Sequence, residues 1–245
     1  MKENSLQVQD YVSPHLDKTT LDPLGDGISS LALIRVSGSD LDVANAARVS
    51  YGKFSTNISE RDKNLIKFLM EHGHSSPFEH NQLSFRVKAP NYVVKQWLRH
   101  RMNSYNEISM RYVKMPVEFY IPKYWRYPDK DNRQVSVGAF ENEELTKIYK
   151  ESLEQSYKAY EKMLEAGVCR EQARGLLPNC IYSEFIFTCN LHSLMHFMKL
   201  RCGKDAQKEI QSYALGLLQL AEPHFPFSLG EWKKVHLVKE YPKIV

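Results

Sequence analysis

Alternating hydrophobic and polar positions mark the clearest strand in this sequence. Over residues 82–88, Leu83, Phe85 and Val87 share one face, and polar or charged residues occupy the other. This period of two is typical of a strand that is buried on one side only. Three further segments have the apolar content and length of strands or extended chain, namely 29–37, 112–121 and 180–189.

Apolar residues at helical spacing predict several helices. In the segment 60–72, Leu65 and Leu69 contribute to an apolar stripe, Ser59 is suited to cap the start, and Gly73 is suited to the end. A longer helix is predicted over about 142–166. The other predicted helices cover about 40–49, 91–102, 169–177, 191–201 and 204–221.

The order of these elements predicts an α+β protein, because helices and strands do not alternate as they do in βαβ repeats. We expect mixed helices packed on a small, largely antiparallel sheet in a single domain over residues 28–225. Residues 1–27 are expected to be a polar leader, and residues 226–245 a C-terminal tail. The charged and aromatic segment 122–140 is expected to be a surface excursion.

Composition changes this picture little. The chain is 42% hydrophobic and 25% charged, and its formal net charge is +4, which by itself does not indicate a nucleic-acid-binding protein. It contains no apolar run of about 18 residues, so we expect no membrane span. The cysteines show no CxxC spacing, and we expect reduced thiols in a cytoplasmic protein. They are Cys169, Cys180, Cys189 and Cys202.

Residues 99–111 form the segment with the most distinctive chemistry. They include three arginines, one histidine, two serines, two asparagines and one glutamate. Buried charges require partners, and guanidinium groups bind phosphate through paired hydrogen bonds, so the segment predicts a site for a polyanion. In a regular helix Arg99 and Arg101 would point about 200° apart, towards two ligands or towards a ligand and a second subunit. The alternative is a solvated helix end with ion pairs to Glu107 and other acidic residues.

Two further segments concentrate histidine. Residues 72–80 contain His72, His74 and His80, but their spacing does not match a helical zinc motif; a ligand-binding polar loop and a plain surface turn both remain open. His192 and His196 are expected on one helical face, either as ligand contacts or as a solvated pair. No glycine-rich phosphate loop and no GxSxG motif occurs. A nucleotide would therefore be held by side chains and loop amides.

Taken together, these segments resemble the flavin-dependent thymidylate synthase family. The resemblance rests on the Arg-His-Arg run at 99–101 followed by Ser109, on 72–80 and on 190–201, and it covers roughly residues 30–225. It implies an α+β homotetramer whose active sites are shared between subunits. It also implies FAD as cofactor, NADPH as reductant and methylation of dUMP to dTMP with 5,10-methylenetetrahydrofolate, without an enzyme cysteine nucleophile. No metal, nucleic acid or membrane partner is expected.

The resemblance also assigns site residues by position. It makes Arg201 the catalytic residue, which contacts the pyrimidine and stabilises its developing negative charge. The positions assigned to FAD are His74, Ser76, Arg99, His100, Arg101, Glu107, Asn190, His192 and His196. Those assigned to dUMP are Gln96, Arg99, Glu107, Ser109, Met110, Arg111, Arg174 and Arg201.

Two functions of other classes are also considered. A single-stranded nucleic-acid binder would use a set of basic residues with two tyrosines as stacking platforms. That set is Arg86, Lys88, Lys95, Arg99, Arg101 and Arg111, with Tyr105 and Tyr112. A histidine-based metallohydrolase is the third hypothesis. A flavin absorbance band, salt-sensitive oligonucleotide binding and stoichiometric metal would distinguish the three.

Overall fold

A four-stranded antiparallel sheet lies at the centre of the computed structural model, which describes residues 20–113 and 117–237. The strands follow one another across the sheet in the order β1, β2, β6, β3. Their bounds are β1 (Ser30–Ser37), β2 (Gln82–Pro90), β6 (Tyr182–Asn190) and β3 (Ser104–Glu107). The predicted α+β class with a small antiparallel sheet is confirmed.

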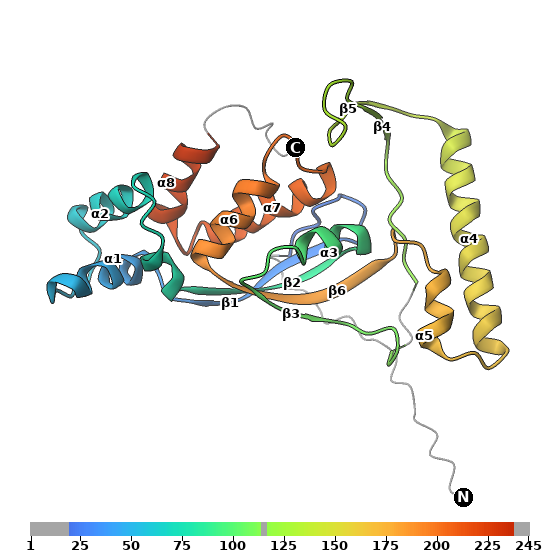
Figure 1. Cartoon of the computed structure of the whole chain (residues 1–245), viewed down its shortest axis with the longest axis horizontal. Helices are drawn as coiled ribbons and strands as arrows, with labels where there is room; N and C mark the ends of the chain where they lie inside the picture. The colour runs from blue at the N-terminus through green and yellow to red at the C-terminus, as the bar shows by residue number, and fades with distance from the viewer. Residues whose placement is uncertain (1–19, 114–116, 238–245) are drawn as a thin grey trace, which may run out of the picture.

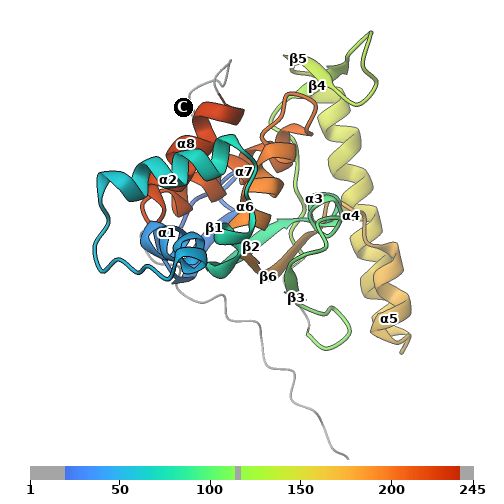
Figure 2. The same cartoon turned by 60° about the vertical axis from the view of Figure 1, so that its left-hand side comes forward.

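Helices cover one face of this sheet and both of its ends (Figure 1). The helices on the face are α3 (Asn91–Trp97), α6 (Leu191–Arg201) and α7 (Lys208–Ala221). Those at one end are α1 (Asp40–Arg48), α2 (Glu60–Glu71) and α8 (Pro226–His236), with the short 3-10 turns η1 (Val49–Tyr51) and η2 (Ser76–His80). At the other end lie α4 (Glu143–Glu165), α5 (Arg170–Ala173) and η3 (Arg174–Leu176), and Figure 2 shows α4 again to one side of the body.

The local signals in the sequence explain these elements. Leu83, Phe85 and Val87 of β2 are completely buried, as their alternation predicts. Ser59 and Asp62 form a reciprocal capping box at the start of α2, which satisfies two backbone N–H groups that the helix leaves unpaired. Apart from α3, the predicted helices are present, although 169–177 is divided between α5 and η3 and the last one begins at Lys208.

Trp97, the last residue of α3, is completely buried in the main core. Its ring lies against aromatic side chains from β6, α6 and α7. The partners are Phe185, Phe187, Phe197 and Tyr213, at centroid distances of 5.3, 5.4, 4.8 and 5.8 Å. Large aromatic contacts of this kind dominate core energetics, so Trp97 fixes the point from which the polar 99–111 segment begins.

The prediction of a helix reaching residue 102 is wrong. The helix ends at Trp97, and β3 begins at Ser104. The hydroxyl of Tyr105 lies 3.2 Å from the carbonyl oxygen of Trp97 and 2.9 Å from that of His100, so it takes carbonyls that a longer helix would use. Arg99 and Arg101 therefore lie in the turn between α3 and β3. The angle of about 200° expected between their side chains in a regular helix does not apply there.

The expected leader and tail both differ from the structure where it describes them. Leu21 pairs with Leu31 of β1 through two backbone hydrogen bonds of 2.9 and 3.0 Å; residues 1–19 lie outside the described part. Residues 226–236 form α8, whose Leu229 and Trp232 belong to the main core. The core therefore extends beyond residue 225.

The segment 122–140 contains a hairpin of β4 (Trp125–Pro128) and β5 (Ser136–Phe140). It is connected to two other parts of the molecule: Trp125 donates to Thr146 of α4 at 3.1 Å, and Arg126 forms an ion pair with Glu209 of α7. In the segment before it, Phe119 forms a bridge to Ile181, as expected of extended chain.

No helix among the described residues has both the length and the apolar character required to cross a bilayer.

Candidate active site

Arg201, at the end of α6, is held by two hydrogen bonds. Its Nε donates to Nε2 of His100 at 3.0 Å, and a terminal guanidinium nitrogen donates to the carbonyl oxygen of Gln96 at 3.2 Å. The first partner lies in the turn after α3 and the second lies on α3 itself. The guanidinium is half-buried and therefore has a fixed position beside the polar segment.

His100 is the buried histidine of this cluster, with 8% of its surface exposed. The pKa of His100 is lowered to about 4, chiefly by burial, with smaller contributions in the same direction from the positive Arg201 and the nearby His196. The ring is therefore neutral at physiological pH, and its Nε2 accepts the hydrogen bond from Arg201. Arg201 keeps its charge, although burial lowers its pKa.

A cavity of about 480 Å³ opens beside this pair. Among the described residues, its lining contains arginine and histidine side chains but no carboxylate: Arg99, His100, Arg101, Met102, Asn103, His192, Ser193, His196, Leu200 and Arg201. Oδ1 of Asn103 is buried and has no hydrogen-bond partner within the described chain. We call this the arginine cavity; its charges and donor groups are suited to an anion.

A neighbouring cavity of about 310 Å³ shares His192 and His196 with the arginine cavity. His74 and Ser75 line it from one side, and Trp232 of α8 lines it from another. Ser76 is exposed on η2, next to Ser75. Asn190 begins α6, where its side-chain oxygen accepts the backbone N–H of Ser193 at 2.7 Å, so this residue has at least a capping role.

A third cavity, of about 530 Å³, is lined by four of the expected substrate positions, whereas Gln96 and Arg111 line neither it nor the arginine cavity. Glu107, Ser109, Met110 and Arg174 all line it, together with Ser183, which donates its hydroxyl to the Glu107 carboxylate. We call it the serine cavity. Arg111 is exposed and forms an ion pair with Glu171 at 3.2 Å, and its backbone N–H donates to the Ser109 hydroxyl at 3.3 Å.

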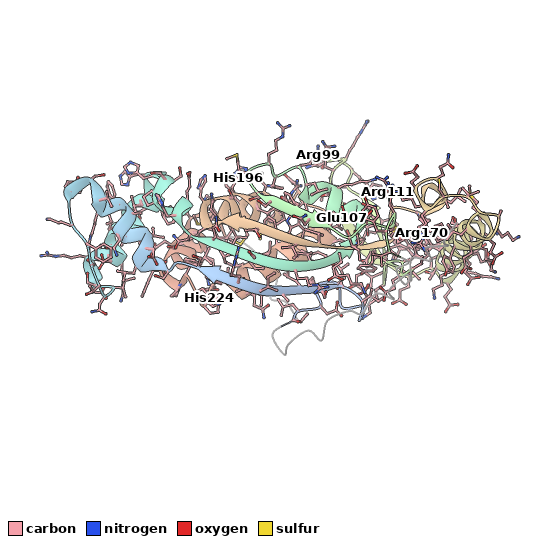
Figure 3. The ribbon with its side chains drawn as sticks, turned by 90° about the horizontal axis from the view of Figure 1, so that it is seen from below. Arg99, Glu107, Arg111, Arg170, His196 and His224 are labelled. Carbon is pink, nitrogen blue, oxygen red and sulfur yellow. The ribbon has the colours of Figure 1, made fainter. Side chains whose placement is uncertain are left out.

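The expected site residues thus form two groups in a single chain. The arginine cavity and the serine cavity have no lining residue in common. Both groups lie along the β3 side of the sheet, where Figure 3 shows Arg99, Glu107 and Arg111, whereas His224 lies towards β1. One chain alone therefore does not bring all the expected substrate residues around one cavity.

Sequence reasoning did not single out several residues of these cavities, among them Asn103, Ser183 and Glu171. Asn103 lies inside the 99–111 segment, whose polar density was a usable signal. Ser183 and Glu171 gave no local signal, because their roles depend on Glu107 and Arg111, which are distant in the sequence.

Many basic residues of the nucleic-acid hypothesis have partners within the chain. Lys88 pairs with Glu118 at 2.6 Å, and Lys95 donates to Asn179 at 2.7 Å. Arg86 pairs with Glu184. The ring of Tyr105 is stacked against Phe187, so it is not available as a platform for a base. These contacts weaken the case for a continuous basic surface.

The described residues give little support to a metal site or to a reactive buried thiol. It contains no group of three or more His, Cys, Asp or Glu residues that could hold a metal ion. Cys180, Cys189 and Cys202 are buried, and burial raises the pKa of Cys202 to about 12 and also raises the pKa of the other two thiols. Thiols of this kind are poor nucleophiles.

The chain is similar in sequence to proteins of a known family. Residues 32–227 match the family described as thymidylate synthase complementing protein. Flavin-dependent thymidylate synthases from Thermosipho africanus and Kosmotoga olearia are 43% and 46% identical to this chain. The alignments cover 83% and 80% of this chain and 90% and 86% of those proteins.

A solved structure is similar as well. The UMP/dUMP methylase PolB from Streptomyces cacaoi, bound with 5-Br dUMP, superposes with a TM-score of 0.80 at 31% identity, covering 86% of this chain and 97% of that one. Because sequence and structure agree over most of the lengths compared, the chain belongs to the flavin-dependent thymidylate synthase family.

Proposed function

We propose that the protein is a methyltransferase that converts dUMP to dTMP, with FAD as cofactor. The carbon donor in this proposal is 5,10-methylenetetrahydrofolate and the reductant is NADPH. The observation that carries the proposal is the arginine cavity, in which Arg201 is fixed by His100 and Gln96 and no carboxylate from the described part of the chain opposes an anionic ligand. The names of the relatives support the same reaction.

The residues of the arginine cavity are suited to FAD. Arg99 and Arg101 supply forked cationic donors for a diphosphate, and the unpaired Oδ1 of Asn103 is free to accept a donor group from the cofactor. His192 and His196 line both this cavity and the neighbouring one. The space available to a cofactor therefore extends beyond the 480 Å³ of the arginine cavity. The other residues proposed to bind FAD are His74, Ser76, Asn190 and Glu107. The chemistry that FAD supplies when bound is hydride donation.

Arg201 is the proposed catalytic residue. Its half-buried guanidinium is oriented before any substrate arrives, and oriented donors stabilise charge that develops in a transition state without further reorganisation. We propose that it contacts the pyrimidine ring and stabilises the negative charge that develops on the ring during the reaction. The neutral His100 holds Arg201 in place without competing as a second cation.

The remaining substrate contacts come from both cavities in this proposal. Gln96 and Arg99 belong to the arginine group, and five positions belong to the serine group: Glu107, Ser109, Met110, Arg111 and Arg174. Arginine and serine side chains are suited to the phosphate of dUMP. Arg99 and Arg201 line one cavity, and Glu107, Ser109, Met110 and Arg174 line another. We therefore propose that a homotetramer completes each site by joining the arginine group of one subunit to the serine group of another.

No cysteine is needed as a nucleophile in this scheme. The three buried thiols have raised pKa values, and Cys169 is exposed, with its thiol 3.3 Å from the side-chain oxygen of Gln172. Activation of the pyrimidine would then depend on binding, orientation and the charge of Arg201.

The proposal is tested by the visible spectrum and the products of the purified protein. We expect a flavin absorbance band and dTMP formation that requires dUMP, the folate and a reductant together. UMP should be assayed in parallel, because the similar structure is named as acting on both nucleotides. A colourless protein that neither takes up FAD nor methylates either nucleotide would contradict the proposal.

Arg201→Ala tests the assigned catalytic role in the same assay. We expect turnover to fall by about 10²–10³-fold, as when one oriented donor is removed from a reaction centre, while the fold and the bound FAD are retained. Arg133→Ala is the matched control, because Arg133 is exposed on the β4–β5 hairpin and should leave turnover unchanged. Near-normal dTMP formation by the Arg201 variant would refute the role.

A further inference from the structure

A chain of polar contacts runs from the β4–β5 hairpin to Gln96. Arg126 of the hairpin contacts both carboxylate oxygens of Glu209, at 2.7 and 3.0 Å. Glu209, in the first turn of α7, is only 3% exposed. Its Oε2 accepts a hydrogen bond of 2.8 Å from the side-chain nitrogen of Gln207, and the side-chain oxygen of Gln207 accepts one from Nε2 of Gln96.

The charge at one end of this chain determines the orientation of both amides. An ionised carboxylate only accepts hydrogen bonds, so Gln207 must turn its NH₂ group towards Glu209. Its oxygen then faces Gln96, which must in turn present its own NH₂ group. Arg126 supplies the opposite charge that pairs with this buried carboxylate.

Gln96 is directly connected to the proposed catalytic residue. Its backbone oxygen accepts from Arg201 at 3.2 Å, and it is half-buried on α3, one residue before the core anchor Trp97. Its main chain is therefore fixed by the core, whereas its side-chain amide depends on Gln207.

We propose that Arg126 and Glu209 are positioning residues for substrate binding, which act through Gln207 to hold the Gln96 amide in one orientation towards dUMP. The inference rests on the proposed function, because Gln96 belongs to the proposed substrate set. It gives the β4–β5 hairpin a role in nucleotide affinity, although the hairpin itself lines neither the arginine cavity nor the serine cavity.

Glu209→Gln is the first test variant, since it keeps the shape of the side chain but allows either orientation of the Gln207 amide. We expect the dUMP dissociation constant of the FAD-bound enzyme, measured without turnover, to rise roughly three- to tenfold, the range for one uncharged hydrogen bond. KM for dUMP should rise with it, while kcat changes less and FAD content stays constant. An unchanged dUMP affinity in the folded variant would overturn the proposal.

Further variants separate positioning from general stability. Gln207→Met breaks the chain in the middle but leaves the Arg126–Glu209 ion pair, and should reproduce the loss of affinity even if the Glu209 variant folds poorly. Arg126→Lys retains the charge and should restore affinity relative to Arg126→Met. Asp40→Asn is the matched control: this carboxylate is also buried, but it accepts from Phe227 and Ser228 at the start of α8, so its loss should lower stability without changing dUMP affinity.

A double-mutant cycle identifies the route of the effect. If the chain acts through Gln96, Glu209→Gln should have no further effect on dUMP affinity in a Gln96→Ala background, because the two changes share one interaction. Additive losses would show that Glu209 acts elsewhere and would overturn the inference while leaving the proposed function intact. A wild-type protein that binds FAD but not dUMP would instead contradict the proposed function itself.

Discussion

The neutral state of His100 is the residue-level feature with the clearest solution consequence. The pKa of this ring is lowered from 6.5 to about 4 in the folded chain. Between these two values the unfolded chain binds a proton at this position and the folded chain does not, so stability falls as the pH drops through the range. The hydrogen bond from Arg201 is lost at the lower end, because a protonated imidazole has no acceptor nitrogen.

His100→Gln tests this assignment, because a glutamine oxygen can still accept from Arg201 but does not titrate. From pH 7.5 to pH 5 the wild type should lose about 1–2 kcal/mol more stability than the variant. The measurement is urea unfolding at both pH values and at one protein concentration, since assembly also affects stability. Other histidines are present in both proteins and cancel. Parallel pH dependences would show that folding does not lower the pKa of His100.

At the level of elements, the turn between α3 and β3 determines where the arginines lie. Residues 99–103 are polar enough to extend a helix into solvent, and the apolar pattern before them gives no stop signal such as glycine or proline. The helix ends because Tyr105 pairs back to the carbonyls of Trp97 and His100 while β3 pairs with β6. This contact depends on the sheet, which explains why helical periodicity alone overestimated α3.

Tyr105→Phe should loosen this turn without removing the ring stacked on Phe187. We expect a loss of about 1 kcal/mol in the free energy of unfolding, typical of one net hydrogen bond, and weaker binding of FAD. Urea unfolding and FAD titration of the apoprotein provide the two readouts. Tyr112→Phe serves as the comparison, because Tyr112 is 73% exposed and its hydroxyl should matter little. Equal effects of the two changes would contradict the role of Tyr105 in the turn.

Other elements show where sequence patterns were sufficient. The stripe and capping residues of α2, the long amphipathic α4 and the alternation of β2 each depend on neighbours a few positions away, and each was predicted nearly to its bounds. By contrast, α8 was expected to be part of a tail. It starts at Pro226 and contains Gly230, and its place in the core becomes clear only from its packing against α2.

At the scale of the whole molecule, long-range pairs account for what the sequence could not predict. The ion pair of Arg126 with Glu209 joins residues 83 positions apart, and the Gln96–Gln207 contact joins residues 111 apart. No spacing rule connects such pairs before the fold is known. The motif residues themselves were found from the sequence, but their division between two cavities was not, because it follows from the course of the turn after α3 and of β3.

That division gives the whole-molecule prediction. If a site joins the arginine group of one subunit to the serine group of another, Arg201→Ala and Arg174→Ala damage different halves of it. An oligomer containing both variants would then include some sites with two intact halves. For equal, random mixing each half is intact with a probability of one half, so about a quarter of the sites should work.

The most direct measurement is therefore the rate of dTMP formation by mixed oligomers of these two variants, co-expressed with different tags and purified through both. The rate should reach about a quarter of the wild-type value, although each variant alone is nearly inactive. The flavin content of the same sample confirms that the cofactor is bound. A mixed oligomer no more active than the average of its two parents would contradict a site shared between subunits.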